Sequence, residues 1–335
     1  MNSIGSPKRN LGIDFLKVWM SFEVVLCHYG HGSEEFLFRY FFSYFRSIAV
    51  PVFMVISFYL SACFLLSREG LFYKLNKRLL RIYQPLFVWA VIYWTIYNAI
   101  AFFGNVNDLY IPIKSLFWQI VTGHSYNTAM WFNVVLAWLT ISFFFITTCS
   151  NKSTSIIMLM SLFAVFVSQS GLNSAFMLLP DELCFPMGRI AECIPYAGFG
   201  LILYKCQCNK EYYLLILFVV SVFFVHEFCG RIFNGEIIGY HYNGMTLFAC
   251  STLLVSLFVF VPFRKTPDFI RRMINFLSHL SMGIYCIHIL IGTLLGFLKI
   301  EIDPFFYSLL IYFVSLVLCF CISKIPCKLF KDIVS

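Results

Sequence analysis

The sequence predicts an all-α fold, a polytopic bundle of about ten transmembrane helices with both termini in the cytosol. The first observation is composition, because 60% of the 335 residues are hydrophobic and only 12% are charged. Soluble domains are about 45–50% apolar and about 25% charged, so this composition excludes a cytosolic enzyme and a disordered chain. The second observation is that apolar residues form continuous runs and do not alternate, which favours helices over an outer-membrane barrel.

Ten stretches approach the roughly 20 apolar residues that a membrane-spanning helix needs. They cover residues 13–31, 44–66, 79–103, 130–149, 154–172, 187–204, 212–228, 244–263, 275–298 and 304–323. The stretch 187–204 contains Arg189, Glu192 and Pro195, which indicates a broken or cavity-lining helix. No segment between the stretches is long enough to fold alone, so residues 1–335 are predicted to form one integral-membrane domain.

The third observation is the distribution of basic residues. With the N-terminus in the cytosol, seventeen Lys and Arg residues lie in cytosolic loops or span ends and six lie on the opposite side. This positive-inside bias predicts that both termini are cytosolic. The net charge of +8 therefore reflects topology, and no nucleic-acid partner is expected. The thirteen Cys residues include no paired CxxC motifs, so no metal site is predicted.

Polar residues interrupt the first span at Asp14, Lys17, Ser21 and His28. At 100° per residue, Lys17 and His28 differ by about 20° after full turns and lie about 16 Å apart along the axis, so they share a face. Ionisable groups within a span are costly to desolvate, which favours a function. The alternative is structural: Asp14 caps the helix, Lys17 extends to the inner interface and His28 lies among outer headgroups. Glu23 faces elsewhere, and its role stays open.

Two further clusters are candidates for binding. Lys77, Arg78 and Arg81 lie within about one helical turn at the start of the third span, where they could bind the phosphates of a polyanion or simply anchor the topology. In the ninth span, a polar group faces one direction because its members are three or four residues apart. It consists of Ser281, Tyr285 and His288.

These polar residues of the ninth span have a structural alternative, since a buried His can serve only to hydrogen-bond a neighbouring helix. Trp131, at the start of the fourth span, could line an outer cavity or belong to an aromatic interface belt.

Five segments, in this order along the chain, resemble those of bacterial membrane acyltransferase family 3, the O-acyltransferases that modify surface polysaccharides and related envelope glycans. They are GIDFLKVWMSFEVVLCHYG, VPVFMVISFYLSACFLLSR, KRLLRIYQP, MWFNVVLAW and LSHLSMGIYCIHIL. In the first of them, Lys17 and His28 have ten residues between them. The chain departs from the family pattern at Lys17, Phe58 and Ala129, where the family usually has Arg, Gly and His.

The resemblance implies a multi-pass enzyme of the bacterial cytoplasmic membrane that transfers an acyl group, expected to be acetyl, to a hydroxyl of a glycan or lipid-linked glycan. Acetyl-coenzyme A is implied as the donor substrate, with no resident cofactor. His28 is the expected base, because imidazole has an ordinary pKa of about 6.5 and exchanges protons near neutral pH. Lys17, with Asp14 beside it, is expected to orient the donor or stabilise negative charge on the thioester oxygen.

A polysaccharide exporter or a flippase for lipid-linked sugars is the rival interpretation. Such a protein would also have many spans, an aromatic cavity and charges within the membrane. Symmetry between the two halves of the sequence would favour it, and the chain shows no convincing internal repeat. Consumption of a thioester donor would separate the two interpretations.

Overall fold

The structure is a computed structural model that describes residues 9–33, 47–66, 71–104, 107–123, 126–150, 153–169, 181–206, 218, 221–222, 225, 245–260, 263, 265–326 and 332–334. Within these residues the regular elements are helices and no strand occurs. The all-α prediction is therefore confirmed.

Apart from α5, the α-helices lie almost wholly within the predicted apolar stretches or extend them. They are α1 (Leu11–Tyr29), α3 (Ala49–Leu66), α4 (Leu71–Gly104), α5 (Ile113–Thr122), α6 (Trp131–Cys149), α7 (Ser153–Gln169), α8 (Asp181–Cys206), α10 (Met245–Phe260), α11 (Asp268–Gly296) and α12 (Pro304–Lys324). The short 3-10 helices η2 (Asn107–Leu109) and η3 (Thr128–Met130) precede α5 and α6. The sequence did not predict α5.

Five of the described helices are long and apolar enough to cross a membrane. They are Ala49–Leu66, Phe72–Gly104, Trp131–Cys149, Asp268–Gly296 and Pro304–Lys324. The predicted count of ten spans is not confirmed, and the cytosolic placement of the termini stays a prediction. Of the other stretches, 212–228 lies almost entirely outside the described residues, and α8 runs as one helix through Pro186 and Pro195, so the break considered there does not occur.

The helix starts place the polar residues of the site. The side chain of Asn10 caps α1 by accepting hydrogen bonds from the backbone N–H groups of Gly12 (2.8 Å) and Ile13 (3.4 Å), so Asp14 is not the cap. Helix α4 begins eight residues before the predicted start. Its 34 residues give a length of about 51 Å, which exceeds the roughly 30 Å hydrocarbon core of a bilayer. The basic cluster of residues 77–81 therefore belongs to the helix itself.

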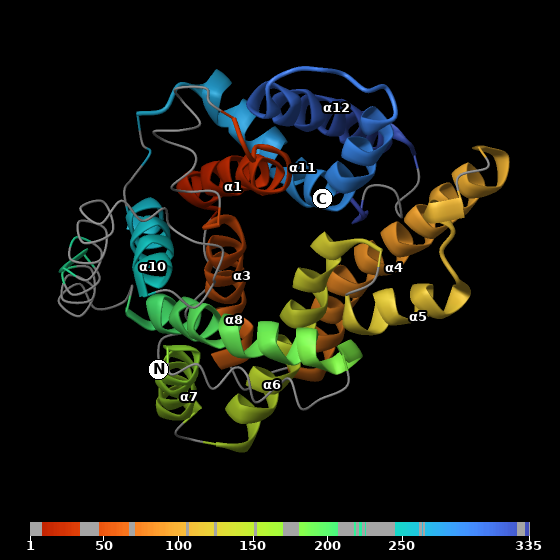
Figure 1. Ribbon diagram of the computed structural model, residues 1–335. Coiled ribbons are helices and arrows are strands. Elements are labelled where there is room, and N and C mark those ends of the chain that lie inside the picture. The colour runs from red at the N-terminus through yellow and green to blue at the C-terminus, as the bar shows by residue number, and fades with distance from the viewer. Residues whose placement is uncertain are drawn as a thin grey trace.

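Helices α1 and α3 lie between the pair α11–α12 on one side and α6 and α8 on the other (Figure 1). The most extensive contacts are those of α3 with α8 and of α1 with α11. Both pairs approach closely at a glycine. A Cβ atom on Gly292 of α11 would lie 2.1 Å from the ring of Tyr29, and one on Gly200 of α8 would lie 2.5 Å from the carbonyl oxygen of Val55. Small residues of this kind let helix backbones meet within a membrane protein.

Candidate active site

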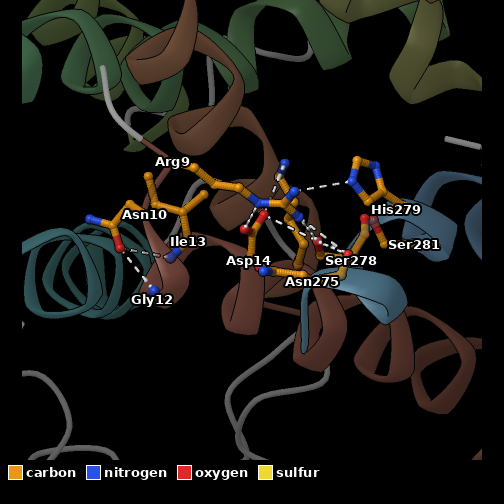
Figure 2. A network of polar contacts seen from close by, with 10 residues as sticks. Arg9, Asn10, Gly12, Ile13, Asp14, Asn275, Ser278, His279 and Ser281 are labelled. Carbon is orange, nitrogen blue, oxygen red and sulfur yellow. Dashed lines mark hydrogen bonds and ion pairs between the residues drawn. The ribbon is translucent and has the colours of Figure 1, made fainter. Parts of the chain in front are cut away.

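A polar network joins the start of α1 to α11 (Figure 2). Arg9 donates a hydrogen bond of 2.7 Å to Oδ2 of Asp14, and its Nη1 lies 3.2 Å from Nε2 of His279. Ser278 Oγ donates to Oδ1 of Asp14 at 3.1 Å. The ammonium nitrogen of Lys17 lies 3.9 Å from the same oxygen. The buried carboxylate of Asp14 therefore holds Arg9 and Lys17 in place through charge-assisted contacts.

This network forms one wall of a cavity of about 670 Å³. The volume falls within the range of small-molecule sites, about 300–1,000 Å³. Helix α4 adds Lys77, Arg81 and Gln84 to the lining of the same cavity. Because four cationic side chains from two segments of the chain line one concave surface, the cavity concentrates positive charge and suits an anionic ligand. The four cationic residues are Arg9, Lys17, Lys77 and Arg81. We call this space the basic cavity.

Asp332 adds a carboxylate to the lining of the basic cavity. Its two neighbours hold it there, because the indole N–H of Trp89 donates to the carbonyl oxygen of Ile333 at 3.1 Å and the N–H of Gly283 donates to that of Val334 at 3.3 Å. Both Ile333 and Val334 are buried. A segment distant in sequence from α1 and α4 therefore contributes to the same cavity.

A narrower pocket of about 240 Å³ adjoins the basic cavity. The two spaces share Lys17, Leu60 and Ser278, so these three residues mark the mouth of the narrow pocket. Its remaining lining is mostly apolar, with a few hydroxyl groups between the apolar side chains. These residues are Phe53, Ile56, Ser57, Phe132, Leu136, Ser281, Met282 and Tyr285.

Three aromatic rings line the narrow pocket at the end farther from Lys17, and we call them the aromatic floor: Phe53, Phe132 and Tyr285. Their ring centroids lie 6.3 Å (Phe53–Phe132), 6.4 Å (Phe53–Tyr285) and 5.6 Å (Phe132–Tyr285) apart. The mouth and the floor are seven residue positions apart on α3 (Leu60 to Phe53) and also on α11 (Ser278 to Tyr285). At 1.5 Å per residue this gives a depth of about 10 Å.

A pair of histidines lies beyond the aromatic floor. The ring centroid of His288 is 6.1 Å from that of Tyr285 and 5.1 Å from that of His28. Nδ1 of the fully buried His288 lies 2.8 Å from the carbonyl oxygen of Tyr285. Because a carbonyl only accepts, Nδ1 carries the proton in the neutral ring and Nε2 keeps its lone pair. Nε2 is buried without a hydrogen-bond partner in the described part of the chain, whereas His28 is exposed.

A family model described as an acyltransferase domain matches residues 10–324. The chain belongs to acyltransferase family 3. The match covers nearly the whole sequence, so it confirms the resemblance, supports membrane acyltransferase activity and does not favour an exporter. No curated protein and no solved structure matches the chain.

The predicted site residues of this family 3 acyltransferase fall into three groups. Asp14, Lys17, Lys77 and Arg81 line the basic cavity. Ser281 and Tyr285 line the narrow pocket, and His28 and His288 lie beyond its floor. The fold thus places the three groups in order from one end of α1 to the other.

Arg78 has a different environment from Arg81. It is not part of the basic-cavity lining. Its Nη2 donates to Oγ of Ser57 at 3.0 Å and its Nε to Oγ1 of Thr140 at 3.2 Å, and its guanidinium carbon lies 5.6 Å from the ring centroid of Phe58. Arg78 therefore ties α4 to α3 and α6, and nothing in this arrangement directs it towards a ligand in the basic cavity.

Trp131 also lies apart from both spaces. It is buried, and the guanidinium carbon of Arg189 lies 5.2 Å from its ring centroid. Arg189 in turn pairs with Glu192 at 2.8 Å. Trp131 therefore joins α6 to α8 by a cation–π contact. Glu23 is fully buried and accepts a hydrogen bond of 2.8 Å from the indole N–H of Trp19.

Sequence reasoning missed several residues of this site. Neither Arg9 nor His279 is singled out by the sequence, because the two residues that meet here are 270 positions apart. Phe53 and Phe132 were not singled out, since the chain has 41 Phe residues and periodicity does not distinguish a pocket wall from a lipid-facing surface. Their positions within two of the five family segments were the one available signal.

Proposed function

We propose that this family 3 acyltransferase transfers an acetyl group from acetyl-coenzyme A to a hydroxyl of a surface polysaccharide or lipid-linked glycan, in the cytoplasmic membrane of a bacterium. The observation that carries the proposal is the order of the three groups along α1. A basic cavity able to bind phosphates opens at one end, the narrow pocket follows, and an exposed histidine with a buried partner lies at the other end.

The donor occupies the basic cavity through its phosphates. Lys77 and Arg81 approach from α4, and Arg9 and Lys17 from the Asp14 network, so the phosphate charges of coenzyme A are met from two sides. Charge-assisted hydrogen bonds of this kind are about twice as strong as neutral ones. The long pantetheine arm that separates these phosphates from the thioester can extend from the basic cavity along α1 in the direction of His28.

His28 acts as the base for the acceptor. The hydroxyl oxygen attacks the thioester carbonyl carbon and His28 takes the hydroxyl proton. The C–S bond then breaks, and the proton held by His28 passes to the departing thiolate, which leaves His28 neutral again. A sugar hydroxyl needs such a base at neutral pH, and general-base catalysis contributes about 10²–10⁴ in rate. His288 supports His28, because its buried ring, with a lone pair on Nε2 left free by the described residues, lies 5.1 Å between centroids from the ring that takes the proton.

The test uses the full chain, purified into lipid nanodiscs, with acetyl-coenzyme A and a glycan fraction from the source cells. We expect protein-dependent release of free coenzyme A thiol together with acetyl esters on the glycan, measured by mass spectrometry. His28→Ala should lower the rate about a hundredfold or more. His31→Ala, at an exposed position just after α1, is the matched control and should keep the wild-type rate. Wild-type transfer by His28→Ala would exclude His28 as the base, and an unconsumed donor would reject the proposed reaction.

A further inference from the structure

The narrow pocket has a lining that suits one part of an acyl thioester. Its walls are apolar at Ile56, Leu136 and Met282, and hydroxyl groups of Ser57 and Ser281 interrupt them. A chain that alternates amide groups with methylene groups matches such a surface, because the amides can hydrogen-bond to hydroxyl oxygens while the methylenes pack on apolar side chains. The mouth at Lys17 opens onto the basic cavity, so a ligand anchored there by its phosphates can extend inwards.

One ring of the aromatic floor, that of Tyr285, is hydrogen-bonded to residues outside the pocket. The hydroxyl of Tyr285 donates a hydrogen bond to the backbone carbonyl of Ala129. The N–H of Ala129 donates to the side chain of Asn127 at 3.0 Å, and Asn127 exchanges two hydrogen bonds of 3.0 Å with the buried side chain of Gln119. The ring of Tyr285 is thus held by a hydrogen bond to the backbone of a buried segment, which is itself hydrogen-bonded to Gln119. The hydrogen bond of Tyr285 to Ala129 therefore anchors the aromatic floor to this segment.

We propose that the narrow pocket binds the acyl end of the thioester donor and that the aromatic floor limits the acyl group to a short chain. The proposal rests on the proposed function, since it needs an acyl-coenzyme A donor in the basic cavity. A pocket about 10 Å deep, and only about 240 Å³ in volume, has to hold part of the pantetheine arm as well. Little room is left for acyl carbons before they meet Phe132 and Tyr285. Each methylene that does not fit costs about tenfold or more in affinity.

The test compares the dissociation constants of acetyl-coenzyme A and octanoyl-coenzyme A for the full chain in nanodiscs. The wild-type protein should bind octanoyl-coenzyme A at least about tenfold more weakly. Phe132→Ala should remove most of this difference by strengthening octanoyl binding, with acetyl binding changed much less. Phe132→Leu, a milder change, should shift the ratio in the same direction. Tyr285→Phe keeps the ring but removes its hydrogen bond to Ala129, and should broaden selectivity by a smaller factor.

Phe143→Ala is the matched control. Phe143 lies on the same helix as Phe132 and is buried, but it packs on Phe58 at 5.2 Å and does not line the narrow pocket. Removal of the Phe143 ring should leave the ratio of the two dissociation constants unchanged. Equal binding of the two donors by the wild type, or equal shifts in Phe132→Ala and Phe143→Ala, would overturn the proposal while leaving acetyl-coenzyme A as donor. Failure to bind either donor would overturn the proposed function and this inference with it.

Discussion

Arg78 and Arg81 are three residues apart in α4, and their side chains meet different surroundings. From the sequence alone both were assigned to one candidate binding cluster, because they lie within about one helical turn of each other. The structure separates them, since Arg81 lines the basic cavity and Arg78 is committed to Ser57, Thr140 and the ring of Phe58. Phe58 stands where the family resemblance leads us to expect glycine, so the ring that supports Arg78 is a feature of this chain.

Exchange of each arginine for lysine should therefore have different effects. Arg81→Lys should raise the KM for acetyl-coenzyme A several-fold and leave the melting temperature unchanged, because an ammonium group cannot reproduce a bidentate guanidinium contact. Arg78→Lys should lower the melting temperature with little change in KM, because it loses hydrogen bonds that contribute about 0.5–1.5 kcal/mol each. Steady-state kinetics and thermal unfolding of both variants check this. A rise in KM of the same size in both would restore Arg78 to the donor site.

His288 allows a test of the histidine pair that does not disturb its packing. In His288→Asn, the amide nitrogen can replace Nδ1 as the donor to the carbonyl oxygen of Tyr285, but no atom replaces Nε2. If Nε2 assists His28, kcat should fall about a hundredfold or more while the KM for the donor and the melting temperature change little. If kcat falls and the melting temperature falls with it, the result would instead assign His288 a structural role alone.

At the scale of helices, the pair α1 and α11 organises the whole site. Helix α1 provides Asp14, Lys17 and His28, and helix α11 provides Ser278, Tyr285 and His288. The relative position of the two helices sets the spacing of all three groups. Their close approach depends on Gly292, which faces the ring of Tyr29, and the hydroxyl of Tyr29 donates to the carbonyl oxygen of Ile289 at 3.3 Å.

Gly292→Ala should therefore separate α1 from α11. A new methyl group at 2.1 Å from the Tyr29 ring is an overpacking change, which costs about 1–3 kcal/mol. We expect a lower melting temperature together with a loss of transfer activity, because His28 precedes Tyr29. Gly296→Ala in the same helix is the control, since the nearest atom to its Cβ would be the Tyr307 hydroxyl oxygen at 3.9 Å. Similar melting temperatures for the two variants would show that α1 has room to move.

The whole molecule is predicted to present the basic cavity to the cytosol, where a soluble donor arrives. Reporter fusions after Ser150 and after Ser335 should both indicate the cytosol, and a fusion after Asn107 should indicate the opposite side. The reason is the concentration of seventeen basic residues on one side, which fixes the orientation of short loops. A cytosolic signal from Asn107 would invert the assignment of α4 and place the basic cavity away from its donor.

Much of this arrangement could be predicted from the sequence. Continuous apolar runs predicted the helices, because each span needs a fixed length of apolar surface. The face shared by Lys17 and His28 follows from helical geometry alone. What could not be predicted were the partners of polar residues across the bundle, such as Arg9 with His279, and the assignment of each Phe to a pocket or to lipid. These depend on helix packing, which in membranes follows shape more than polarity.

The aromatic floor has a bioenergetic consequence. The basic cavity and the exposed His28 lie on opposite sides of it, and a continuous file of water between them would let protons cross. Each charge that leaks dissipates about 2.3 kcal/mol per 100 mV of membrane potential. Three packed rings interrupt that path with apolar surface. The enzyme is therefore expected to transfer a group from one side of the membrane to the other without letting protons leak across it.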